Sequence, residues 1–132
     1  DHAPSTALTE ASGRSFKVVV VDDDMLILMN TVAMLEDLGH QVLEANSGDE
    51  VLALLDAHPD VDLLVTDQAM PNMSGTELAE KVAHRFPNLP IILATGYGEV
   101  PDEGQRAMTK LGKPYTQAAL SDALEKALRA KV

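Results

Sequence analysis

The chain has 132 residues, of which 45% are hydrophobic, and this composition fits one globular domain with a buried core instead of a disordered chain. The formal net charge of -11 argues against direct binding of nucleic acid, because a phosphate-binding surface needs an excess of Lys and Arg. The absence of cysteine excludes disulfides and thiolate metal sites. No apolar run approaches the roughly 20 residues that a membrane helix needs. We therefore expect a cytoplasmic domain without membrane insertion.

The first residues differ in composition from the rest of the chain. Residues 1–15 are rich in Ala, Ser and Thr and show no apolar period, so we interpret them as a flexible leader or linker. From residue 16 onward, apolar runs typical of strands alternate with helical periods. We therefore expect residues 16–132 to form the folded domain.

The first predicted strand covers residues 18–21 and stops at three consecutive acids, residues 22–24. Apolar residues at helical spacing between 28 and 38 predict a helix after it, and Gly39 supplies the C-terminal stop of that helix. Residues 41–45 then predict a short strand. We interpret the last of the three acids as a first-turn residue of the helix, where it favours the helix dipole.

The next strand also ends at an acid. Ser47 and Glu50 have the spacing of a capping box, which predicts a helix that reaches about Ala57. The apolar run 63–66 predicts a strand that stops at Asp67. An acid therefore follows both the first and the third predicted strand.

Polar residues follow the remaining strands as well. Ser74 and Glu77 form a second capping box and predict the start of another helix. Residues 91–94 predict a strand that stops at Thr95, and a shorter strand around Leu111 stops at Lys113. The apolar stripe over residues 116–130 predicts the last helix.

Strands that alternate with helices predict an α/β fold with a doubly wound, five-stranded parallel sheet and helices on both faces. In the flavodoxin-like strand order 2-1-3-4-5, ligands bind beyond the carboxyl ends of strands one and three. Asp22, Asp23 and Asp67 would then converge, with Thr95 and Lys113 beside them. Acids so close together repel one another unless a divalent cation lies between them, which indicates a magnesium and phosphoryl site.

The residues at these strand ends resemble those of the receiver domain of two-component response regulators. The resemblance rests on VVVVDDD at 18–24, DQAMPNMSG at 67–75, AT at 94–95 and KPY at 113–115, and it covers about residues 17–130. Each motif alone is weak, but all four in this order are specific. LATGYGE at 93–99, taken together with LGKPY, resembles the C-terminal receivers of hybrid sensor histidine kinases and some stand-alone receivers.

The resemblance implies a phosphoacceptor function with Mg²⁺ as the cofactor. Asp67 would take a phosphoryl group from a phosphohistidine of a histidine kinase or a histidine phosphotransfer protein. Asp23, Asp67 and the backbone carbonyl of Ala69 would bind Mg²⁺ directly, and Asp22 would act mainly through water. Such a domain is a signalling module, not an enzyme with a separate substrate, and it promotes its own phosphorylation and dephosphorylation.

The resemblance also assigns roles to the residues of the last two strands. Thr95 would donate a hydrogen bond to a phosphoryl oxygen, and Lys113 would pair first with Asp67 and then with the phosphoryl group. Pro114, often after a cis bond in such domains, would hold the loop. We also expect that the domain can form a homodimer.

Two features depart from the usual receiver pattern. Lys110 lies three residues before Lys113, at the position where receivers usually have an aromatic switch residue. The segment from Thr95 to Lys113 is about one helical turn short, so we expect a stunted or irregular helix between the fourth and fifth strands. Both departures put the usual conformational coupling in question.

Three apolar residues at the start of the first helix, Met25, Leu26 and Met29, allow two interpretations. Core packing accounts for about half of them, and the remainder would form an adaptable apolar patch that docks a histidine-bearing helical bundle.

Two other functions remain open. A strand followed by Asp22 and Asp24 is also typical of haloacid-dehalogenase-like phosphohydrolases, in which the first Asp, here Asp22, is the nucleophile. Those enzymes normally need a cap or a longer chain and a later acidic pair, which we do not find after Lys113. The third possibility is a degenerate receiver that only serves as a scaffold for partners.

Overall fold

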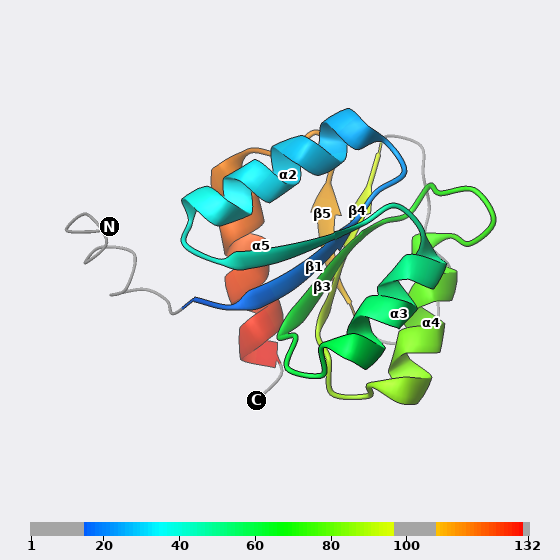
Figure 1. Cartoon of the computed structure of the whole chain (residues 1–132). Helices are drawn as coiled ribbons and strands as arrows, with labels where there is room; N and C mark the ends of the chain where they lie inside the picture. Colours follow the sequence, from blue (N-terminus) through cyan, green and yellow to red (C-terminus); the bar gives the residue numbers. More distant parts are fainter. Residues whose placement is uncertain (1–14, 97–107, 131–132) are drawn as a thin grey trace.

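The computed structural model describes residues 15–96 and 108–130, and in this part of the chain a five-stranded sheet lies between two pairs of helices (Figure 1). The elements are β1 (Lys17–Val21), α2 (Met25–Asp37), β2 (Gln41–Ala45), α3 (Gly48–Ala57), β3 (Leu63–Asp67), α4 (Gly75–Arg85), β4 (Ile91–Thr95), β5 (Thr109–Gly112) and α5 (Gln117–Ala130). The strand order is β2-β1-β3-β4-β5, and every neighbouring pair is parallel. The predicted doubly wound α/β fold is therefore confirmed.

Two hydrophobic cores lie on opposite faces of the sheet. Helices α2 and α5 cover one face, and α3 and α4 cover the other (Figure 1). The strand β1 contributes to both cores, since Val18 and Val20 pack on the α2 and α5 side and Val19 and Val21 pack on the other. Burial on both faces explains why this strand is a continuous apolar run without alternation.

The helix ends follow the predicted capping residues, with two differences. Ser74 and Glu77 form the complete capping box of α4. The side chain of Ser47 caps α3, but the carboxylate of Glu50 accepts its hydrogen bond from the backbone N–H of Asn46, at 2.6 Å, and not from Ser47. The reciprocal half of the predicted box is therefore wrong by one residue.

The start of α2 corrects another interpretation. Asp24 is the N-cap residue, and not part of the first turn, because its side chain accepts hydrogen bonds from the backbone N–H groups of Leu26 and Ile27. At the other end, Gly39 has a positive φ of 99°, which agrees with the predicted stop. The cap fixes the direction in which the chain leaves the acids at the end of β1.

Among the described residues, no helix combines the length and apolarity that a membrane span requires. The expected short helix between the fourth and fifth strands falls on residues 97–107, outside the described part of the chain.

Candidate functional site

Three carboxylates meet where the carboxyl ends of β1 and β3 lie side by side. Asp22 and Asp23 follow β1, and Asp67 is the last residue of β3. One carboxylate oxygen from each lies within 4.8 Å of the others. Asp22 and Asp67 are buried, at 4% and 3% exposure, whereas Asp23 is exposed. The predicted convergence of these side chains agrees with the geometry.

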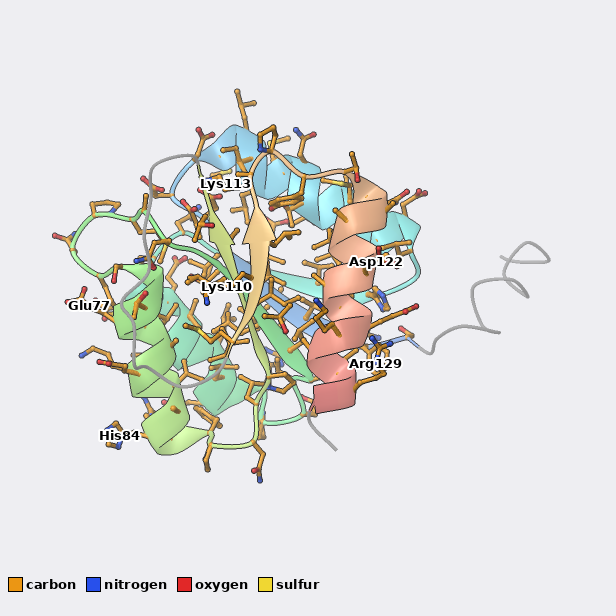
Figure 2. All side chains as sticks on the ribbon, turned by 180° about the vertical axis from the view of Figure 1, so that it is seen from behind. Glu77, His84, Lys110, Lys113, Asp122 and Arg129 are labelled. Atoms are coloured by element: carbon orange, nitrogen blue, oxygen red, sulfur yellow. The ribbon has the colours of Figure 1, made fainter. Side chains whose placement is uncertain are left out.

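A lysine reaches this acidic cluster from the last strand. The Nζ atom of Lys113 lies 2.8 Å from Oδ1 of Asp67, and the lysine side chain is largely buried. Figure 2 shows Lys113 close to the carboxyl-terminal tip of β5. Its backbone N–H donates to the carbonyl oxygen of Thr95, at 2.8 Å, which brings the end of β4 to the same edge. The peptide bond between Lys113 and Pro114 is cis.

Electrostatics distinguish Asp22 from an ordinary surface acid. Burial raises the pKa of Asp22 to about 6, and the charges of Asp67 and Asp23 add to the rise. The backbone N–H of Asp24, which donates to Oδ1 of Asp22 at 2.8 Å, and the charge of Lys113 oppose it. Burial is the largest cause, and the charge of Asp67 raises the pKa of Asp22 more than the charge of Lys113 lowers it.

The loop after β3 is held by contacts that the sequence motifs did not reveal. Oε1 of Gln68 accepts hydrogen bonds from both the backbone N–H and the hydroxyl of Thr76, each at 2.9 Å. A Cβ atom at Gly75 would lie 2.5 Å from the backbone oxygen of Asp67, so only glycine allows this close approach. Ala69, the predicted carbonyl ligand, is exposed in this loop. The sequence indicated this packing through the glycine that ends the run DQAMPNMSG, at 67–75.

Comparison with known proteins identifies the fold family. The model of the response regulator receiver domain matches residues 18–125. The chain belongs to this family. Chemotaxis protein CheY1 of Helicobacter pylori is 37% identical to this receiver domain over 116 residues, which cover 83% of the chain and 94% of CheY1.

Two further proteins are similar to this receiver domain. The CAI-1 autoinducer sensor kinase/phosphatase CqsS of Vibrio cholerae is 39% identical over 83 residues, which cover 61% of this chain and 12% of the kinase. The crystal structure of a response regulator receiver domain protein from Clostridium thermocellum has a TM-score of 0.79 at 31% identity and covers 88% of this chain and 96% of its own. The comparisons give no support to the phosphohydrolase alternative.

The acidic cluster of the receiver domain fits a magnesium ion. Three carboxylates supply the hard oxygen ligands that Mg²⁺ prefers, and a cation there would compensate the charges of Asp67 and Asp23, which contribute to the raised pKa of Asp22. Asp22, Asp23 and Asp67 are the residues that would hold the ion or its waters.

We predict that Asp22→Asn stabilises the receiver domain at neutral pH without Mg²⁺. The pKa of about 6 in the folded state exceeds the ordinary 3.8, so the fold loses stability as the pH rises through this interval. At a pH above both pKa values, this pKa shift lowers the free energy of unfolding by about 3 kcal/mol. Because nearby water screens part of this effect, we expect Asp22→Asn to raise the free energy of unfolding by about 2 kcal/mol. Asparagine retains an oxygen that accepts from the Asp24 N–H.

Urea denaturation in EDTA measures this effect, and we expect the gain at about pH 7.5 but little gain at about pH 4, where the folded state carries the proton. Asp23→Asn serves as the matched control, because it removes an exposed charge from the same cluster and should stabilise less. Equal stability of wild type and Asp22→Asn at neutral pH would contradict the prediction.

Proposed function

We propose that the receiver domain accepts a phosphoryl group on Asp67 from a phosphohistidine, within a two-component or phosphorelay system. The observation that carries this proposal is the pairing of the buried Asp67 carboxylate with Lys113 at 2.8 Å, next to two further carboxylates. A carboxylate is a competent nucleophile toward phosphorus when positive charge screens the incoming phosphoryl oxygens.

In the transfer, a carboxylate oxygen of Asp67 attacks phosphorus as the bond from phosphorus to the imidazole nitrogen of the donor breaks. The product is an acyl phosphate, and the imidazole nitrogen of the donor keeps the electron pair and takes up a proton. Lys113 pairs with the phosphoryl oxygens, and the Thr95 hydroxyl donates a hydrogen bond to one of them. Mg²⁺, when held directly by Asp23, Asp67 and the Ala69 carbonyl and mainly through water by Asp22, would supply further positive charge at these oxygens.

The same groups support reversal of the modification. Asp67 as an acyl phosphate is open to hydrolysis, and we propose that the receiver domain promotes both its own phosphorylation and its own dephosphorylation. The acyl phosphate would shift a two-state conformational equilibrium. Position 110 on β5 holds a lysine with an exposed side chain. Because this residue is not aromatic, the response does not use a rotating aromatic ring at that position. A homodimer and a cytoplasmic location remain predictions.

The partner surface that we propose lies at the start of α2. Met25, Leu26 and Met29 are 52%, 75% and 57% exposed, so the expectation that core packing accounts for about half of them is wrong. They follow directly after the acids of the site. We assign this apolar patch to docking of a histidine kinase or a histidine phosphotransfer protein. The match to 12% of a sensor kinase/phosphatase supports a place within a longer kinase, and the match to 94% of CheY1 supports a stand-alone regulator.

Incubation with phosphoramidate and Mg²⁺ tests the proposed function. We expect intact-mass spectrometry to show one added phosphoryl group, fragmentation to locate it on Asp67, and EDTA to suppress it. No incorporation under conditions in which Mg²⁺ binding is demonstrated by calorimetry would instead favour the degenerate, scaffolding receiver.

A further inference from the structure

The loop that carries Lys113 is tied to helix α2 by a side-chain hydrogen bond. The hydroxyl of Tyr115, two residues after Lys113, lies 2.6 Å from Oγ1 of Thr31. Thr31 is 1% exposed and faces the core between apolar neighbours of α2. A buried hydroxyl in such surroundings needs a partner, so each of these two groups satisfies the other.

Helix α2 is also fixed relative to the acids of the site. The side chain of Asp24 caps the first turn of α2, and the backbone N–H of the same residue donates to Oδ1 of Asp22. The helix is therefore a common reference for both halves of the site. One end is joined to the acids, and its middle is joined through Thr31 to the segment after Lys113.

We infer that Tyr115 is a positioning residue, whose hydrogen bond to Thr31 sets the distance between the Lys113 ammonium group and the carboxylates. Only Pro114 separates Lys113 from Tyr115, so a displacement of the tyrosine is transmitted to the lysine over a short, stiff stretch of backbone. The Tyr115 ring packs against the core on the α2 and α5 side. This packing holds the ring in place, and the hydrogen bond of its hydroxyl to Thr31 fixes its orientation. This inference rests on the proposed function, because it concerns the lysine that pairs with the phosphoryl group.

The electrostatics of Tyr115 agree with its place beside the site. Burial raises the pKa of Tyr115, and its hydrogen bond with Thr31 opposes the rise. The charges of Asp22 and Asp67 also raise this pKa and that of Lys113 lowers it, so the hydroxyl lies within electrostatic range of all three.

A second side-chain tie to helix α2 offers a matched control. Nε2 of Gln117, in the first turn of α5, donates to the carbonyl oxygen of Met34 and to Oδ2 of Asp37, each at 3.1 Å. These contacts join α5 itself to α2, and they lie farther along the chain from Lys113 than Tyr115 does. If these hydrogen bonds only stabilised the fold, the loss of either one would have the same effect on the phosphorylation rate.

The test compares the phosphorylation rate of the full chain by phosphoramidate and Mg²⁺ in Tyr115→Phe, Thr31→Val and the double variant. Phenylalanine keeps the ring and valine keeps the shape of threonine, so each removes mainly the hydrogen bond. We expect each single variant to react roughly three- to tenfold more slowly, and the double variant to be no slower than either single one. We expect Gln117→Ala to react at the wild-type rate.

A wild-type rate in Tyr115→Phe, different rates in Tyr115→Phe and Thr31→Val, or equal slowing in Gln117→Ala would overturn the inference. The ¹⁵N signal of the Lys113 ammonium group, recorded without Mg²⁺ and without phosphodonor, supplies a readout independent of phosphorylation. It should shift in Tyr115→Phe and Thr31→Val and stay in place in Gln117→Ala. If the wild type accepts no phosphoryl group, the proposed function fails, and this signal still decides whether Tyr115 positions Lys113.

Discussion

Replacing Asp67 with alanine is expected to abolish incorporation of a phosphoryl group from phosphoramidate and Mg²⁺. The carboxylate is the nucleophile in the proposed transfer, and alanine offers no oxygen to take its place. The variant should remain folded, because the charge of Asp67 is one cause of the raised pKa of Asp22, and its loss relieves that repulsion. Intact-mass spectrometry of the variant and wild type after equal incubation measures the difference.

The control is Asp60→Ala, which removes an exposed carboxylate that pairs with Lys17, away from the acidic cluster. It should be phosphorylated like the wild type. Continued incorporation in Asp67→Ala would mean that another carboxylate is the acceptor. If adding Asp22→Asn to that variant then removed the incorporation, Asp22 would be the acceptor, as in the phosphohydrolase alternative. The proposed role of Asp67 would then be wrong.

The location of the acidic cluster was predictable because it depends on strand order alone. Each apolar run ends at a polar residue, and parallel strands bring these ends to one edge of the sheet, so Asp22, Asp23 and Asp67 had to converge once β1 and β3 were neighbours. The same rule brought Thr95 and Lys113 to that edge. No side-chain detail was needed for this step.

The contacts that orient the site were not predictable in the same way. Tyr115 and Thr31 are separated by 84 positions, and their hydrogen bond depends on how α2 is rotated about its axis against the segment between β5 and α5. The strand pattern contains no information about that rotation. The capping of α2 by Asp24 was also misjudged, because an acid before a helix has the same sequence appearance as N-cap or as first-turn residue, and only the backbone conformation separates the two.

Lys113→Met is expected to slow phosphorylation by phosphoramidate about 100-fold, since a preorganised positive group aimed at developing charge commonly contributes this much. The ammonium group of Lys113 lies 2.8 Å from Oδ1 of Asp67, and it is the group that would pair with the phosphoryl oxygens. Methionine keeps an unbranched side chain of similar length but provides no charge. The initial rate from intact-mass time courses at a saturating Mg²⁺ concentration measures the effect.

Lys110→Met gives the matched control, because Lys110 lies on β5 and Lys113 follows its end (Figure 2), and the side chain of Lys110 is exposed whereas Lys113 contacts Asp67. The control should keep the wild-type rate. Lys113→Met should also lose stability at neutral pH without Mg²⁺, because the lysine charge lowers the pKa of Asp22, and this loss should shrink as the pH falls and Asp22 takes up a proton. Equal rates in the two variants would show that positive charge at position 113 does not assist the transfer. Asp67 would then depend on the bound cation alone for the screening of its phosphoryl group.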